Sequence, residues 1–319
     1  MATETSAPPL VRAGGLSAGA DRRISRHRLR ERLGTQAFLI PITVVLALFF
    51  LVPLAESVYW SFTDYSGFSQ SSHLVGLRNY REIFTDSEVL TGLGFTLLYA
   101  VATTVIVTVI AIPLATVLNR RFPGRNAVRA AFFFPAVPSM ALLGLVWTFV
   151  LSPLSSGVIN SVLGDVFGVG PVPWLSDNTL AKVSVVTVGV WAQAGWHAVL
   201  YLAYLQSVPR DYYEAATIDG ATPRQQFFRI TLPLLAPAMT VSQFLLLING
   251  LRVYDLPFTL TKGGPGYATT TFTQVLIQRG VSGGDYGLGA ALGVVFLVAV
   301  AIVLFLQLSV TRRLERRFR

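Results

Sequence analysis

Three polar or aromatic residues lie close together within one strongly apolar run of the chain. Gln193, Trp196 and His197 are spaced three and four residues apart, so they share one face of a helix. An amide hydrogen-bonds to hydroxyl groups, and a flat indole ring stacks on the C–H face of a sugar. This spacing therefore indicates a site for a polyhydroxylated ligand. The alternative is that the aromatic rings are packing residues or form an interfacial belt.

Few other residues have the types that catalysis or metal binding requires. The chain has no cysteine, and its three histidines are not paired at metal-ligand spacing. We interpret His197 alone as a packed or hydrogen-bonded residue. Lys182 and Lys262 do not follow a glycine, so the chain lacks the Gly-Lys-Ser/Thr end of a P-loop, and we expect a tight turn at 263–266. We expect neither an enzyme active site nor a cofactor bound by this chain.

The composition indicates a membrane protein. Of the 319 residues, 53% are hydrophobic and 13% are charged, which is too apolar for a soluble domain. A helix of about 20 apolar residues crosses about 30 Å of hydrocarbon. The apolar runs predict an all-α integral membrane protein with six transmembrane helices, at residues 37–58, 93–118, 130–152, 180–206, 234–259 and 286–310.

Two of these runs contain residues that are unusual at membrane depth. The third contains Pro135 and Pro138, and the fifth contains Asn249, Arg252 and Asp255. Such residues usually lie against neighbouring helices or a cavity and not against lipid. Because Arg252 and Asp255 are three residues apart, we predict an ion pair between them along one helix.

The distribution of basic residues predicts the orientation. If the N-terminus is cytoplasmic, 19 arginines fall inside and five lysines or arginines fall outside, in agreement with the positive-inside rule. The net charge of +9 then reflects membrane orientation and does not indicate nucleic-acid binding. We expect a basic cytoplasmic tail over 1–35, a six-helix domain over 36–311 and a basic cytoplasmic tail over 312–319.

A polar hairpin is predicted in the cytoplasmic loop at about 207–235. Pro209 suits the first turn of one short helix, and Gly220 ends that helix. Thr222, Pro223 and Gln225 form a capping-box pattern that begins a second short helix. Clustered aromatic residues follow, which favours docking against another protein. The alternative is a solvated loop between two spans.

The hairpin resembles the EAA loop of the membrane permease subunits of binding-protein-dependent ABC importers. The match comprises Glu214, Ala215, Ala216, Gly220, Ile230, Leu232 and Pro233 at the family's spacing. Further pieces, at 75–84, 135–139, 205–221 and 260–266, are similar to the carbohydrate branch that includes the maltose and glycerol-phosphate transporters.

The resemblance implies a function and a set of partners. The hairpin would carry coupling helices that sit in a cleft of a separate cytoplasmic ATPase, and two such ATPase subunits would bind ATP and Mg. A second, similar permease, an extracytoplasmic substrate-binding protein and the surrounding lipid would complete the system in a bacterial cytoplasmic membrane. The chain would form the translocation pathway for a sugar, an oligosaccharide or a polyol derivative.

The resemblance also points to residues that contact the substrate, namely Ser139, Gln193, Trp196 and Asn249. An ion-coupled secondary carrier is one alternative, although it predicts acidic residues deep in the membrane and internal repeats. A membrane anchor that moves nothing is another. It would leave the polar groups of the fourth run unexplained.

Overall fold

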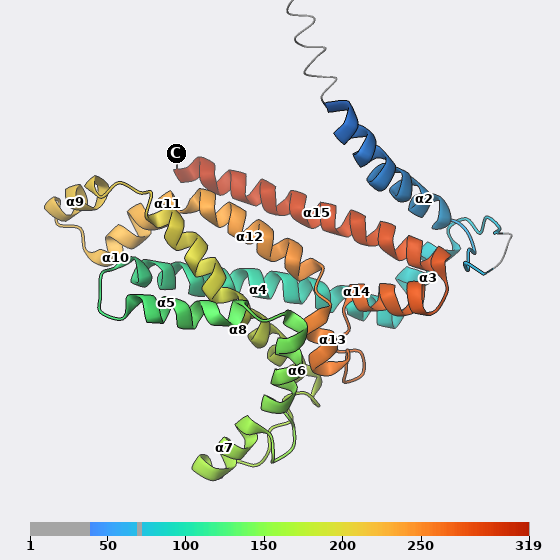
Figure 1. Cartoon of the computed structure of the whole chain (residues 1–319), viewed down its shortest axis with the longest axis horizontal. Coiled ribbons are helices and arrows are strands. Elements are labelled where there is room, and N and C mark those ends of the chain that lie inside the picture. Colours follow the sequence, from blue (N-terminus) through green and yellow to red (C-terminus); the bar gives the residue numbers. More distant parts are fainter. Residues whose placement is uncertain (1–38, 69–71, 319) are drawn as a thin grey trace, which may run out of the picture. The chain divides into compact units, whose positions relative to one another are not determined.

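The computed structural model describes residues 39–68 and 72–318, which divide into two units between Glu56 and Ser57. The predicted tail over 1–35 lies outside the described residues. Within the described part of the chain the regular elements are helices, and the β pairing is one antiparallel bridge between Thr63 and Leu74 (Figure 1). The all-α prediction is confirmed for these residues.

The described helices follow one another along the chain in the order given below. A first helix runs from Leu39 to Trp60 and includes the π-helical turn η1 (Ala47–Leu51) and α2 (Val52–Trp60). The later elements are α3 (Arg78–Thr85), α4 (Ser87–Asn119), α5 (Arg125–Phe133), η2 (Phe134–Ala136), α6 (Met140–Val150), α7 (Val158–Phe167), α8 (Asn178–Leu205), α9 (Asp211–Ile218), α10 (Pro223–Gln226), η3 (Phe227–Thr231), α11 (Leu232–Leu234), α12 (Ala236–Leu251), α13 (Asp255–Thr261), α14 (Phe272–Val275), η4 (Leu276–Ser282) and α15 (Tyr286–Phe318).

Four of the described helices are long and apolar enough to cross a membrane: Leu39–Trp60, Ser87–Asn119, Asn178–Leu205 and Tyr286–Thr311. Two further pairs of consecutive helices are long and apolar enough to cross a membrane only when each pair is taken as one span, and each pair is sharply bent. Arg125–Ala136 meets Met140–Val150 at 95°, and Pro223–Leu234 meets Ala236–Leu251 at 66°. The described chain therefore has four candidate spans, or up to six if each bent pair is one span.

The bends correct two predicted spans. The run over 130–152 is not one helix, because the proline-containing turn η2 interrupts it and Ser139 begins α6 as a new N-cap, accepting from the N–H of Leu142 at 3.3 Å. The run over 234–259 is also broken. The helix α12 ends at Leu251, and α13 begins only at Asp255.

The predicted ion pair between Arg252 and Asp255 is wrong. Arg252 is the C-cap of α12, whereas Asp255 is in the first turn of α13. Among the described residues, the ion pairs do not include either side chain. A spacing of three residues brings side chains together only on a continuous helix, and the break at 252–254 removes that condition.

The expected turn at 263–266 is confirmed. Gly263 and Gly266 adopt left-handed backbone conformations, with φ of 89° and 51°. The turn is closed by the N–H of Thr269, which donates to the Gly263 carbonyl at 3.1 Å, and by the Thr269 hydroxyl, which donates to the Gly264 carbonyl at 2.8 Å.

The main core forms where α8 and α12 pack against α4 (Figure 1). Small residues bring the backbones close, as at Gly250 of α12, where an added Cβ would lie 2.7 Å from the Cα of Ala100 in α4. Close approach of this kind favours helix association in membranes, because it increases van der Waals contact. The helix α4 is therefore the common support for α8 and α12.

An ion-pair cluster fixes the beginning of α4 to η4. The Asp86 carboxylate caps α4 by accepting from the N–H groups of Glu88 and Val89, and Arg279 of η4 pairs with both Asp86 and Glu88, the latter at 2.8 Å. Burial raises the pKa of Asp86, but the hydrogen bonds from Arg279 and the two N–H groups outweigh it and hold the pKa below its ordinary value.

The close approach at Gly250 gives a testable prediction. Gly250→Leu forces a side chain against the α4 backbone, so we expect a loss of about 1–3 kcal/mol of stability. The matched control is Gly94→Leu, on α4 itself, where an added Cβ meets no atom within 4 Å. Thermal unfolding of the purified proteins checks the difference. Equal midpoints for the two variants would contradict the proposed helix packing.

Candidate functional site

The predicted cytoplasmic hairpin is present as two short helical segments. The first is α9, with Asp211 and Glu214 in its first turn, and Gly220 follows it in a left-handed conformation with φ of 77°. The N–H of Ala221 donates to the Ala216 carbonyl at 2.9 Å, which closes the end of the helix. The prediction that Gly220 ends the first helix is confirmed.

The second segment begins with the predicted capping box. The Thr222 N–H donates to Oε1 of Gln225 at 2.7 Å, and the Gln225 N–H donates to Oγ1 of Thr222 at 3.3 Å. Helix α10 then continues through the π-helical turn η3 into α11. One detail differs from the prediction: Pro209 precedes the N-cap Arg210, so it lies just outside α9.

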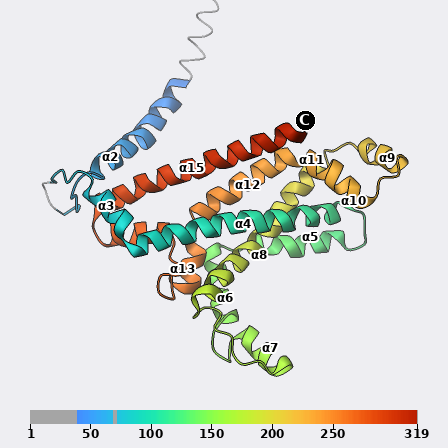
Figure 2. The same cartoon turned by 180° about the vertical axis from the view of Figure 1, so that it is seen from behind.

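The base of the hairpin is attached to the helix bundle. Phe227 and Leu232 pack against the main core, and the Tyr213 hydroxyl lies 3.2 Å from the buried Thr231 hydroxyl, which joins α9 to η3. Gln226 Nε2 donates to Oγ1 of Thr217 at 3.0 Å. Figure 2 shows the hairpin at the same end of the second unit as the connection between α4 and α5. The hairpin is thus tied to the ends of α4 and α8.

The outer side of the hairpin exposes large apolar side chains. Ile218 is 87% exposed, and Tyr212 and Phe228 are 55% and 54% exposed. Of the seven EAA-type positions, Glu214, Ala215 and Gly220 are exposed, and the other four, Ala216, Ile230, Leu232 and Pro233, are half-buried. Apolar groups on an otherwise polar projection are typical of a protein-binding surface.

The four residues expected to contact substrate come from three helices. Gln193 is half-buried and donates to its own helix at the Gly189 carbonyl, 3.3 Å away, whereas Trp196 is 40% exposed on the same helix. Ser139 is exposed and caps α6, and Asn249 is exposed on α12. Gln193 and Trp196 lie close together along α8, as expected.

His197 has the structural role expected of it. It is 2% exposed, and its Nδ1 lies 2.7 Å from the Ser242 hydroxyl of α12. The ring therefore joins α8 to α12. His197 is buried, and its ring lies edge-on to the exposed ring of Trp196 with centroids 4.7 Å apart, so it supports Trp196 from behind and is not itself open to a ligand.

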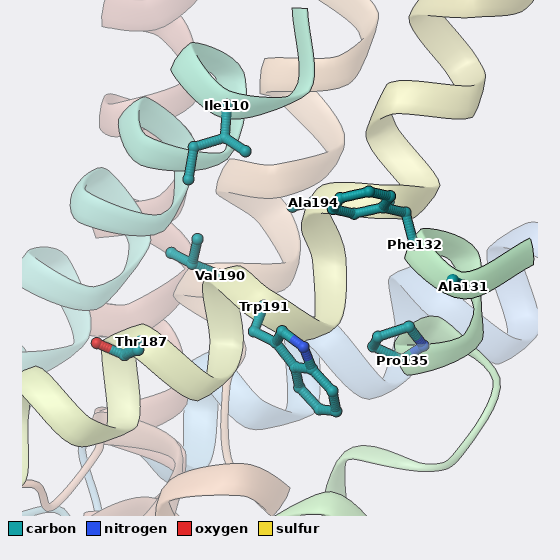
Figure 3. Close-up of a pocket in the computed structure, with 9 residues that line it drawn as sticks. Ile110, Ala131, Phe132, Pro135, Thr187, Val190, Trp191 and Ala194 are labelled. Carbon is teal, nitrogen blue, oxygen red and sulfur yellow. The ribbon is translucent and has the colours of Figure 1, made fainter. Parts of the chain in front are cut away.

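An apolar cavity of about 380 Å³ lies between α4, α5 and α8 (Figure 3). Trp191, Phe132 and Pro135 are among its lining residues, and the four predicted contact residues are not. Trp191 is 42% exposed and stands edge-on to Trp147, with ring centroids 5.3 Å apart. Sequence reasoning missed Trp191, although it belongs to the same run and is only five residues before Trp196.

Comparison with known proteins assigns this arrangement to a family. Residues 107–319, more than half of the chain, match the family of binding-protein-dependent transport system inner membrane components. The chain belongs to this family. It is an integral membrane permease component of a transport system, and the family predicted from the hairpin is confirmed.

Relatives match over nearly their whole length. The chain is 33% identical over 289 residues to the trehalose/maltose transport system permease protein of Thermococcus litoralis, covering 90% of this chain and 97% of the relative. It is 32% identical over 289 residues to the sn-glycerol-3-phosphate transport system permease protein of Salmonella typhimurium. The match covers 89% of this chain and 95% of the relative.

A solved structure shares the fold. The crystal structure of a bacterial ABC transporter involved in the import of the acidic polysaccharide alginate contains a chain with a TM-score of 0.75 at 23% identity. The match covers 91% of this chain and 99% of the other. The fold of the permease is therefore common to both.

Proposed function

We propose that the chain is one permease subunit of an ABC importer and forms part of the translocation pathway for a carbohydrate or polyol derivative. The observation that carries the proposal is the capped hairpin, whose base packs into the bundle while Ile218 at its outer side is exposed. A segment that is packed against the membrane helices at its base and exposed at its outer side can bind a separate protein and transmit that protein's movement to the helices.

The partners follow from this assignment. Two cytoplasmic ATPase subunits bind ATP and Mg, and one of them holds the hairpin. An extracytoplasmic binding protein delivers the substrate, and a second homologous permease completes the pathway. The bacterial cytoplasmic membrane is the location that relatives of this kind imply. We propose six spans, with each bent pair counted as one, and both termini in the cytoplasm, since the basic residues favour that orientation.

The substrate class is supported by the relatives. The permease of Thermococcus litoralis is named for trehalose and maltose, and that of Salmonella typhimurium for sn-glycerol-3-phosphate. Gln193 and Trp196 would supply an amide and a stacking surface to such a ligand, with Ser139 and Asn249 as further contacts. Trp191 adds a second indole along the same helix.

The ion-coupled carrier is the less favoured alternative. Deep acidic groups are its usual coupling sites. Within the described membrane helices, Glu56 lies near one end of its span, and Asp255 lies in the short helix α13 beyond α12.

The coupling proposal predicts separate effects on transport and on insertion. Gly220→Trp and Glu214→Lys should weaken ATPase association and abolish most uptake, because both residues belong to the exposed hairpin. An added Cβ at Gly220 meets no atom within 4 Å, so we expect the loss of ATPase association to arise from strain in the left-handed backbone and from the altered surface. Co-purification of the ATPase and uptake into vesicles are the measurements.

Gly168→Trp is the matched control for the hairpin. Gly168 follows α7 with φ of 63°, and it also has no atom within 4 Å of an added Cβ. This variant should retain the ATPase. Wild-type association and uptake in Gly220→Trp would exclude the coupling role of the hairpin.

The pathway proposal predicts reduced uptake in Gln193→Ala and Trp196→Ala, by about tenfold each, the effect of about 1.4 kcal/mol of lost ligand interaction. Expression and ATPase association should persist. The control is Val183→Ala, because Val183 lies on the same helix and its side chain is 54% exposed. The protein with this substitution should take up substrate at the wild-type rate. Uptake is measured in membrane vesicles and normalised to assembled complex. Unchanged uptake in both variants would assign these side chains to packing.

A further inference from the structure

A basic hollow lies in the connection between α4 and α5. It has a volume of about 360 Å³, and its lining residues include Arg121 and Arg125. Between Asn119 and Phe134 the sequence contains four arginines and no acidic residue. Among the described residues, no carboxylate forms an ion pair with Arg121 or Arg125. The hollow therefore carries positive charge that the described chain does not neutralise.

The first turns of α5 combine this charge with an apolar surface. Arg125, Arg129, Phe132 and Phe133 stand at positions i, i+4, i+7 and i+8, so they share one face of the helix. Phe132 and Phe133 are 47% and 38% exposed. At 1.5 Å per residue, Phe132 lies roughly 10 Å beyond Arg125 along the helix axis. One face thus changes from cationic to aromatic over about the distance from a headgroup to the upper part of an acyl chain.

Arg129 joins α5 to α4 beside the exposed aromatic residues. Its Nη2 donates to the Leu118 carbonyl in the last turn of α4 at 2.9 Å. The contact holds the beginning of α5 beside the end of α4, next to the hollow that Arg121 and Arg125 line. The backbone that carries the two arginines is therefore fixed by the packing of α5 on α4.

We propose that this hollow binds the phosphate group of an anionic phospholipid of the cytoplasmic leaflet, with an acyl chain lying against Phe132 and Phe133. The two guanidinium groups match a phosphate, which accepts several charge-assisted hydrogen bonds. The aromatic surface, of which Phe132 also lines the apolar cavity between α4, α5 and α8, favours a lipid over a free anion, because a free phosphate leaves it uncovered. The choice of leaflet rests on the orientation given under the proposed function.

The test measures lipid binding directly. The full chain, purified in its assembled transporter, is titrated with phosphatidylglycerol or phosphatidylcholine of identical acyl chains, and bound lipid is counted by native mass spectrometry. The wild type should bind phosphatidylglycerol selectively. Because each arginine near a lipid phosphate contributes on the order of 1 kcal/mol, Arg121→Gln combined with Arg125→Gln should weaken that binding about 30-fold.

The control removes the same charge elsewhere. Arg78→Gln combined with Arg81→Gln alters two exposed arginines of α3 and should leave phosphatidylglycerol binding unchanged. Equal binding by wild type and the Arg121/Arg125 variant, or an equal loss in the control, would overturn the site. Displacement of the lipid by millimolar inorganic phosphate would overturn the assignment to a lipid.

The readout is independent of transport. Lipid binding is measured without sugar, so a chain that carries a different substrate would still give the expected result. The orientation is checked separately, because the natural chain has no cysteine and Asn126→Cys introduces a single label in the hollow. Labelling by an impermeant maleimide in intact cells would contradict both the proposed orientation and the cytoplasmic leaflet.

Discussion

The packing of α8 and α12 against α4 is the constraint on which the rest of the second unit depends. The hairpin is the segment of chain that joins α8 to α12, so the positions of its two ends follow from where these helices lie on α4. The ring of His197 adds a polar link between α8 and α12 through Ser242. Any rearrangement of these helices must therefore move the base of the hairpin.

The hairpin combines a buried base with an exposed outer side. Phe227 and Leu232 belong to the packing around the core, and the Tyr213–Thr231 contact holds the two helical segments together. At the other extreme, Ile218 is 87% exposed. A rigid attachment transmits displacement because packed interiors resist deformation. The proposed coupling between ATP hydrolysis on another subunit and substrate movement uses this stiffness.

The parts of the site that sequence predicted are those governed by local chemistry. Gly220 and the Thr222 capping box are determined by a few neighbouring residues, so their patterns identified the turn and the second helix before any tertiary contact was known. Hydropathy found the apolar runs but not their breaks, because it averages over a window: the proline turn inside 130–152 lies among apolar residues, and the break at 252–254 is too short to end the run over 234–259. The expected Arg252–Asp255 pair does not form because the helix is broken between these two residues.

Trp191 was missed because the cavity it lines is formed with α4 and α5, which spacing along α8 does not reveal.

The central claim is that the hairpin is held by an ATPase subunit. The most direct measurement places a photo-crosslinking amino acid at Ile218, the most exposed large apolar side chain of the hairpin, and identifies the cross-linked product from intact membranes by mass spectrometry. The account predicts a product with the ATPase of the transporter, lost when Gly220→Trp is added. Cross-linking to lipid or to an extracytoplasmic binding protein, without the ATPase, would contradict it.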